Sequence, residues 1–382
     1  MSTQGVWWKQ WSPDEVTVGD PDVPDVWKTC VLSGVFYGGN NYNGRLGSRI
    51  SSVFVILFVS TAFTLFPVVA AQVKWLRIPR YVYYFARYFG TGVIVATAFI
   101  HLLDPAYDEI GGASCVGQTG NWALYSWCPA IVLATLVLTF LVDLASGMYV
   151  ERKYGRRQGG CCDNDVIEDA VVSKPQKGNP ASKNDLERCT LNESANSVDV
   201  AGQKSYDVVS DSESDINVQP FESQIGAFLI LEFGIIFHSV MIGLNLGTTG
   251  DNFGELYAVL VFHQSFEGLG IGARLSAISF PEGKKWWPYA LCAAYGLTTP
   301  ISIAIGLGVR TTYDGNSYNV NVVSGVLDAI SAGILIYTGL VELLARDFLF
   351  HQEKNRSVSK VCFMVGCMLL GAGIMSLLGK WA

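Results

Sequence analysis

Eight long apolar runs constrain the fold of this 382-residue chain more than any other feature. Each run can cross the hydrocarbon core of a bilayer as a helix, which takes about 20 predominantly apolar residues. A helix satisfies its own backbone hydrogen bonds in lipid, so the runs predict an all-α, polytopic membrane protein with eight transmembrane helices. The predicted spans are residues 50–71, 82–103, 128–150, 225–247, 254–276, 286–309, 321–344 and 360–380.

Composition supports a membrane protein and excludes several functions. Only 15% of the residues are charged, against about 25% in soluble domains. The formal net charge of −7, without a basic domain or stripe, argues against nucleic acid as a partner. The sequence contains no HExxH zinc-protease motif and no Walker A phosphate loop. We therefore expect neither an enzyme nor an ATP-driven pump.

The distribution of Lys and Arg predicts the orientation of the helices. These residues gather in or just after the connections that follow spans one, three, five and seven, whereas the other three connections together hold only Arg310. Cytoplasmic loops carry the excess of basic residues in membrane proteins. The four basic connections are thus predicted to be cytosolic and both termini extracellular.

This topology divides the chain into four parts. Residues 1–49 are predicted to be an extracellular segment, 50–150 transmembrane helices one to three, 151–223 a cytosolic loop, and 224–382 helices four to eight. The loop is polar, charged and poor in aromatic residues, which is typical of disorder.

Two interpretations of the loop stay open, a solvated linker and a regulatory segment. In the regulatory case, the ubiquitin machinery would be a partner and Cys161 and Cys162 a candidate contact for a soft metal ion. The candidate ubiquitin acceptors are Lys174, Lys177, Lys183 and Lys204.

Disulfide bonds are expected only among the cysteines on the extracellular side. Cys115 and Cys128 both fall in the connection between spans two and three, and they are one candidate pair. Cys30 is a competing partner. Cys292, Cys362 and Cys367 lie in predicted helices, where they are expected to pack as small apolar residues.

The stretch HQSFEGLGIG, residues 263–272, places polar side chains inside a predicted span. His263 and Glu267 are four residues apart and share one helical face. An imidazole and a carboxylate at this spacing can bind a divalent cation such as Zn²⁺, and His238 of the neighbouring span can supply a third ligand. A buried carboxylate without a cationic neighbour also needs a cation to neutralise it.

Other polar residues near these spans are secondary candidates for the metal site or its pathway. They are Ser239, Asn245, Gln264 and His101. The alternative for His101 is a simple hydrogen bond to a neighbouring helix. Asp328 is a further buried carboxylate, while Glu342 can pair with Arg346 one turn along its helix.

Acidic residues near the extracellular mouth favour cation binding on that side. Asp104, Asp108 and Glu109 follow span two without a basic residue among them. Such a field concentrates cations. The same pattern can also arise from the positive-inside rule alone.

The sequence resembles the ZIP (Zrt-, Irt-like) metal transporters. HSVMIGLNLG at residues 238–247 and HQSFEGLGIGARL at 263–275 are similar to the paired fourth- and fifth-helix signature of that family. The eight spans, the outward termini and the loop after span three match it too. Over nearly the full length the chain is similar to fungal high-affinity plasma-membrane zinc transporters, which implies a plasma-membrane location.

The resemblance implies a transport site between helices four and five, built from His238, His263 and Glu267. Two-metal members use additional ligands at positions where this chain has Ser239, Ile242 and Gln264. None of these is an anionic ligand, so one transported metal ion is expected. The cytosolic loop is often histidine-rich in the family, yet residues 151–223 contain no histidine.

The sequence therefore predicts a zinc importer that works by alternating access, with zinc as substrate and no cofactor. The lipid bilayer and the zinc ion are its expected partners, and a homodimer is a further candidate assembly. One alternative is a carrier of the same fold for Fe²⁺ or Mn²⁺, because ligand type alone separates these metals poorly. A metal-sensing receptor without net transport is the other.

Overall fold

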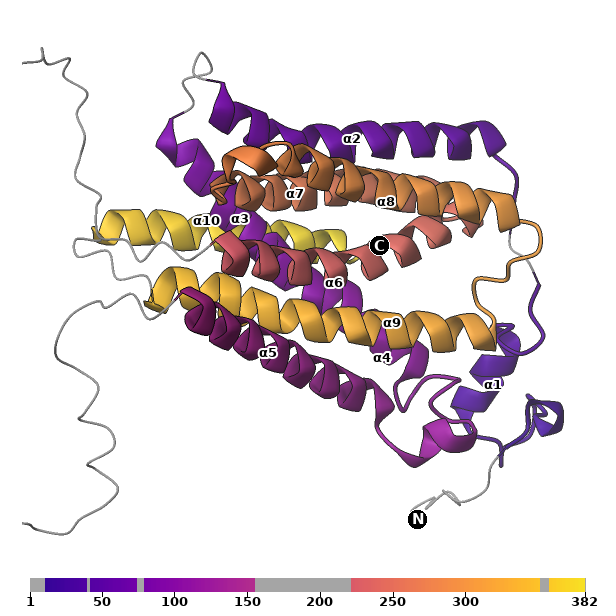
Figure 1. Ribbon diagram of the computed structural model, residues 1–382. Coiled ribbons are helices and arrows are strands. Elements are labelled where there is room, and N and C mark those ends of the chain that lie inside the picture. The colour runs from indigo at the N-terminus through magenta and orange to yellow at the C-terminus, as the bar shows by residue number, and fades with distance from the viewer. Residues whose placement is uncertain (1–10, 40–41, 74–78, 155–220, 351–356, 382) are drawn as a thin grey trace, which may run out of the picture. The chain divides into compact units, whose positions relative to one another are not determined.

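The computed structural model describes residues 11–39, 42–73, 79–154, 221–350 and 357–381. These ranges contain helices and no strand, which confirms the all-α prediction (Figure 1). The helices are α1 (Asp25–Leu32), α2 (Leu46–Gln72), α3 (Arg80–Ala96), α4 (Asp104–Ile110), α5 (Trp127–Tyr154), α6 (Phe221–Thr248), α7 (Phe253–Ala277), α8 (Trp287–Val309), α9 (Tyr318–Tyr337) and α10 (Val358–Leu378). Two π-helical stretches, Thr97–Leu103 and Thr338–Phe350, continue α3 and α9. The predicted loop at 151–223 lies almost entirely outside the described residues.

Seven helices in the described ranges are long and apolar enough to cross a membrane. Two of these seven are composite, because Tyr81–Ile110 joins α3 to α4 and Tyr318–Leu349 joins α9 to the stretch that follows it. Helix α7 has 25 residues and matches the predicted span at 254–276, but it does not belong to the apolar set. Its polar residues His263, Gln264 and Glu267 are buried inside the protein and not exposed to lipid.

The membrane helices pack as two groups. Helix α2 packs against α7 and α8, and α8 packs against α6, so these four form the first group. In the second group α3 packs against α10, while α9 packs against α4 and Thr97–Leu103. The groups meet where α3 crosses α7 and where α6 crosses α9. Gly90 and Gly270 lie at the first crossing, where a Cβ atom on Gly90 would come within 2.2 Å of the Gly270 Cα.

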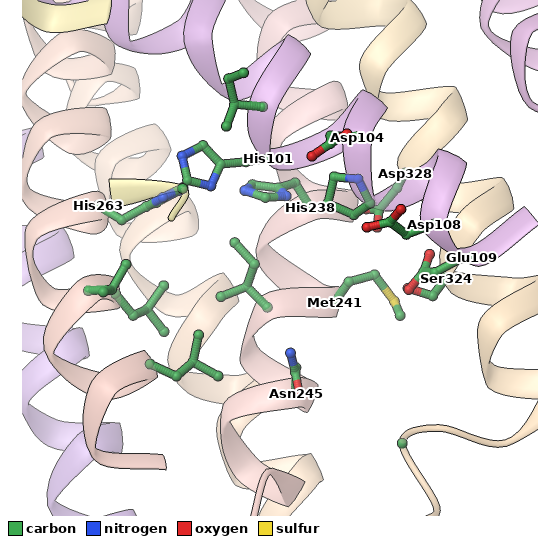
Figure 2. Close-up of a pocket in the computed structure, with 18 of the residues that line it drawn as sticks. His101, Asp104, Asp108, Glu109, His238, Met241, Asn245, His263, Ser324 and Asp328 are labelled. Atoms are coloured by element: carbon green, nitrogen blue, oxygen red, sulfur yellow. The ribbon is translucent and has the colours of Figure 1, made fainter. Parts of the chain in front are cut away.

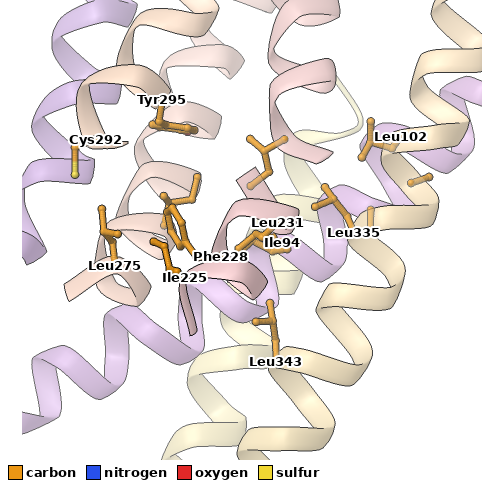
Figure 3. Close-up of a cluster of buried hydrophobic side chains, with 14 of the residues drawn as sticks. Ile94, Leu102, Ile225, Phe228, Leu231, Leu275, Cys292, Tyr295, Leu335 and Leu343 are labelled. Atoms are coloured by element: carbon orange, nitrogen blue, oxygen red, sulfur yellow. The ribbon is translucent and has the colours of Figure 1, made fainter. Parts of the chain in front are cut away.

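Apolar side chains from both groups form the largest buried cluster (Figure 3). Ile94 and Leu102 come from the second group, whereas Phe228, Leu231 and Tyr295 come from the first. Where such side chains leave water, burial stabilises the fold by about 25 cal/mol per Å² of apolar surface. Inside a bilayer the hydrophobic effect between helices is absent, and van der Waals packing between the side chains stabilises the contact instead. The cluster therefore joins the two groups of helices through apolar contacts.

The disulfide bond pairs Cys30 with Cys115, so the candidate pair Cys115–Cys128 is wrong and the competing partner Cys30 is right. Cys128 is a free thiol at the start of α5, buried in an apolar cluster with Ala106 and Ile110. Sequence proximity favoured Cys128, but packing draws its side chain into this cluster. The disulfide instead ties α1 to the connection after α4.

Aromatic contacts also hold the segment around α1 against the start of α9. The Trp27 and Phe36 rings stack with centroids 5.9 Å apart, and the Phe36 and Tyr318 rings stack at 5.8 Å. The backbone N–H of Tyr318 donates to the Val35 carbonyl over 3.1 Å. Residues near the amino terminus are thereby fixed to the same end of the bundle as α4.

Candidate metal site

Three histidines from three different elements converge inside the bundle. His101 comes from the π-helical stretch after α3, His238 from α6 and His263 from α7, and all three are buried. The His263 ring centroid lies 5.1 Å from that of His101 and 5.4 Å from that of His238. The His101 and His238 centroids are 6.5 Å apart, and Figure 2 shows the rings grouped together.

Within the described ranges, no three His, Cys, Asp or Glu side chains are already arranged to hold one metal ion. The imidazoles must therefore turn toward a common point before they can share a cation. The Nε2 atoms of His238 and His263 are buried and have no hydrogen-bond partner among the described residues. Such unpaired nitrogens are costly in a low-dielectric interior, and a metal ion would satisfy them.

Glu267 follows His263 by one helical turn on α7. Its Oε2 atom is 3.7 Å from His263 Nε2 and 3.1 Å from the Tyr295 hydroxyl. Its Oε1 atom is buried without a partner in the described part of the chain. The predicted spacing thus does bring the imidazole and the carboxylate together. The role of His238, His263 and Glu267 as ligands stays a prediction.

The secondary candidates Gln264 and Ser239 flank this group. Gln264 Oε1 accepts a hydrogen bond from Ser60 over 3.0 Å and lies 3.1 Å from the Tyr295 hydroxyl. A tyrosine has a single hydroxyl hydrogen, so Gln264 and Glu267 compete for it. Ser239 is buried beside His238 on α6, and its Oγ atom lacks a partner among the described residues.

His101 is held by a neighbouring helix, as its alternative interpretation expected, and it also faces the other histidines. Its Nε2 atom lies 3.0 Å from the Met375 carbonyl oxygen of α10. When Nε2 carries the proton and donates to that carbonyl, Nδ1 keeps a lone pair that can bind a metal ion. The π-helical backbone around His101 is a geometry often found at functional sites.

A pocket of about 360 Å³ leads from the three imidazoles toward the α1 end of the bundle. Asn245 lines this pocket away from the histidines, and its Oδ1 atom accepts a hydrogen bond from Thr249 over 2.7 Å. The described lining includes no Lys or Arg. Tyr313 lies in the connection before α9, where burial and the nearby Glu109 and Asp314 carboxylates raise the pKa of its hydroxyl. Tyr313 is therefore neutral at physiological pH.

Sequence reasoning overlooked Tyr295, Ser60 and Glu232. A tyrosine inside an apolar helix was a usable signal for Tyr295, since a buried hydroxyl usually has a hydrogen-bonding partner. Glu232 is 5% exposed, and neither of its carboxylate oxygens has a partner in the described part.

The predicted ion pair between Glu342 and Arg346 is confirmed.

In the described ranges, seven long apolar helices around an imidazole-lined pocket define a multi-pass membrane protein whose interior contains potential metal ligands. The family profile of the ZIP zinc transporters matches residues 46–379, and the chain belongs to that family. It is 64% identical to zinc-regulated transporter 1 of Saccharomyces cerevisiae, over 98% of each chain. It is also 36% identical to zinc-regulated transporter 1 of Schizosaccharomyces pombe, over 90% of this chain and 88% of that one.

A more distant relative has a different metal in its name. Fe(2+) transport protein 1 of Arabidopsis thaliana is 28% identical over 87% of this chain and 85% of its own length. Family membership therefore specifies the fold and the class of transporter, but it does not specify a single metal ion.

Proposed function

We propose that this protein imports Zn²⁺ into the cytosol. The observation that carries the proposal is the convergence of His101, His238 and His263 at the end of a pocket, in a chain 64% identical to a zinc-regulated transporter. Neutral imidazoles and a carboxylate are ligands that suit Zn²⁺. Zinc is the substrate, and the protein itself needs no cofactor.

In the proposed mechanism, a hydrated zinc ion enters the pocket from the α1 end and exchanges water for protein ligands. His238, His263 and Glu267 bind it, and His101 lies on the pathway. The group of α2, α6, α7 and α8 then moves against the other group, so that the site faces the cytosol. Alternating access of this kind commonly takes place around a site near the middle of the bilayer.

The topology that accompanies this function has eight transmembrane helices, with α7 as the fifth. In this topology both termini are extracellular, which would place the disulfide Cys30–Cys115 in an oxidising compartment. We further propose a plasma-membrane location, a regulatory cytosolic loop open to ubiquitination, and a homodimer as candidate assembly. The described helix α7 supports this topology because it is long enough to span the bilayer.

The first experiment measures radioactive zinc uptake in yeast cells that lack their own zinc importers. Wild-type protein is compared with His263→Ala and Glu267→Ala at equal surface abundance. We expect uptake by the wild type and its loss in both variants. The exposed carboxylate of Glu255 on α7 provides a matched control, because Glu255→Gln should leave uptake unchanged. Strong uptake by both site variants would place the pathway elsewhere.

The pH dependence of uptake is a second expected outcome. Protons compete with a metal ion for imidazole and carboxylate ligands, so zinc binding becomes weaker as the pH falls. Uptake at a fixed concentration of free zinc should therefore decrease as the external pH falls from about 7 to about 5. An increase of uptake over this range would argue against imidazole ligands.

An Fe²⁺ or Mn²⁺ carrier is the second candidate function, favoured by the likeness to an Fe(2+) transport protein. Competition distinguishes the two, because a zinc importer should retain most of its radioactive zinc uptake at matched concentrations of Fe²⁺. Equal inhibition by iron and by unlabelled zinc would contradict zinc preference. Purified protein reconstituted in liposomes distinguishes these two transporters from a metal-sensing receptor. Liposomes that contain a receptor would accumulate no metal ion in their lumen.

A further inference from the structure

We propose that Glu109, Asp328 and Ser324 form a second cation site, through which hydrated divalent ions pass before they reach the histidines. This outer carboxylate site lies in the same pocket as the three imidazoles, and its role in transport rests on the proposed function. Glu109 lies in the last turn of α4, whereas Ser324 and Asp328 lie one turn apart on α9. Both helices belong to the second group, which leaves His238 and His263 on the other group.

Close packing of α4 on α9 fixes the geometry of this site. The Ser324 hydroxyl donates to Glu109 Oε1 over 2.6 Å. At the neighbouring Gly325, an added Cβ atom would come within 3.0 Å of the Glu109 Cβ. The side chain of Glu109 is therefore held against α9, with its second oxygen left over for another ligand.

Asp328 is the observation that points to a cation. Its residue is 5% exposed, it lines the pocket, and its Oδ1 atom has no hydrogen-bond partner in the described part of the chain. Glu109 Oε2 is likewise buried without a partner there. Asp328 is buried and Glu109 half-buried, and ionised carboxylates with unsatisfied oxygens in such places are costly unless a metal cation or a proton neutralises them. The view in Figure 2 draws Asp328 between the histidines and the Glu109–Ser324 pair.

The chemistry of this site differs from that of the imidazole group. Carboxylates, a hydroxyl and retained water are hard oxygen ligands, which suit hydrated divalent cations and bind Zn²⁺ less tightly than imidazoles do. Asp104 and Asp108 line the same pocket and add negative charge, while no Lys or Arg belongs to its described lining. The outer carboxylate site should thus attract cations at low concentration without selecting strongly among them.

The outer carboxylate site has a defined kinetic consequence. It raises the local concentration of cation beside the imidazoles, so its loss should weaken capture and leave the later movement of the helix groups intact. We therefore expect Asp328→Asn to raise the KM for zinc uptake several-fold, with a maximal rate close to that of the wild type. Loss of an imidazole ligand should instead abolish uptake.

Binding of Mn²⁺ to purified full-length protein tests the site without any need for transport. Mn²⁺ prefers oxygen ligands, and its free form is counted directly by electron paramagnetic resonance. The parent protein carries His238→Ala and His263→Ala, which removes the imidazole pair. We expect this parent to bind Mn²⁺ and Asp328→Asn or Glu109→Gln in the same background to bind it at least about tenfold more weakly.

Glu255→Gln is the matched control, since it removes an exposed carboxylate at the same end of the bundle. Unchanged Mn²⁺ affinity in both Asp328→Asn and Glu109→Gln would overturn the outer carboxylate site, whatever the protein transports. Weakened Mn²⁺ binding together with an unchanged KM for zinc would overturn its place on the uptake route. Absence of zinc uptake by the wild type would instead contradict the proposed function and leave the binding result standing.

Discussion

Arg49 shows how a single buried side chain can fasten two helices. It lies on α2 with 0% exposure, and its Nη1 atom donates to the carbonyl oxygens of Leu246 and Gly247, 3.2 and 3.0 Å away. A further donor of the guanidinium reaches the Thr249 carbonyl. These carbonyl oxygens lie at the carboxyl end of α6, where the last acceptors of a helix have no donor within the helix. The planar fork of arginine can serve several of them at once, whereas lysine cannot.

Replacement of Arg49 by methionine should therefore destabilise the protein. Several buried carbonyl oxygens would lose their donor, and each such loss costs about 1–3 kcal/mol. We expect a lower melting temperature in detergent and less protein at the cell surface. The matched control is Arg45→Met, because Arg45 is exposed one turn earlier. Equal melting temperatures for the two variants would contradict the capping role.

The disulfide gives a second prediction for single residues. Cys30 and Cys115 are 85 residues apart in sequence, and a cross-link over a long loop typically stabilises a protein by about 2–4 kcal/mol. Cys115→Ser should lower the melting temperature and leave Cys30 as a free thiol, which a maleimide labels after denaturation without reductant because the Cys30 side chain is buried in the folded protein. Cys128→Ser is the control, because it leaves the disulfide intact. Labelling of Cys30 in the Cys128→Ser variant would point to the other pairing.

At the scale of helices, the crossing of α3 and α7 depends on two glycines. A Cβ atom on Gly90 would meet the Gly270 backbone, so the helices must separate to accept Gly90→Ala. Overpacking of this kind typically costs about 1–3 kcal/mol. We expect a lower melting temperature and reduced zinc uptake. Gly366→Ala on α10 is the control, because no atom of the described residues lies within 4 Å of its added Cβ atom. It should be neutral or stabilising by up to about 1 kcal/mol.

The sequence predicts the helices well where lipid dictates their composition, and less well where protein surrounds them. The apolar runs at α2, α5 and α10 follow directly from the length needed to cross a bilayer. The spacing of His263 and Glu267 on α7 also follows from helical periodicity. The Cys30–Cys115 pairing and the contacts of Tyr295 do not, because they join segments far apart in the chain. Such contacts depend on packing, which one sequence does not reveal.

Local periodicity also misses the backbone around His101. The apolar pattern of span two predicts a regular helix, whereas Thr97–Leu103 is π-helical. A π-helical turn shifts the side chains that follow it, and that shift accompanies the approach of His101 to the other two histidines. The sequence therefore identifies all three histidines as candidates, but it does not predict the π-helical backbone that accompanies the approach of His101 to the other two.

For the whole molecule, the division of the helices into two groups suggests how the site is exposed to each side in turn. His238 and His263 belong to the first group, whereas His101 and the outer carboxylate site belong to the second. A movement of one group against the other would therefore separate ligands that the described arrangement brings together. Contacts between the groups must change during such a movement, and contacts within a group need not.

Two cysteine pairs with the same geometry can test this difference. An added Cβ atom on Gly234 of α6 would lie 3.2 Å from the Ile334 Cβ of α9, across the groups. An added Cβ atom on Gly296 of α8 would lie 3.2 Å from the Thr61 Cβ of α2, within one group. Both separations are near the Cβ–Cβ distance of about 3.5–4.5 Å found in disulfides.

Oxidation of the pair Gly234→Cys and Ile334→Cys should therefore block zinc uptake, because the cross-link holds α6 to α9. Oxidation of Gly296→Cys with Thr61→Cys should leave uptake largely intact, because α8 and α2 move together. Both are measured as radioactive zinc uptake before oxidation, after oxidation and after reduction, with the wild type treated alike to account for Cys30–Cys115. If the cross-linked α6–α9 pair still transports at the wild-type rate, transport does not involve movement between the groups at this crossing.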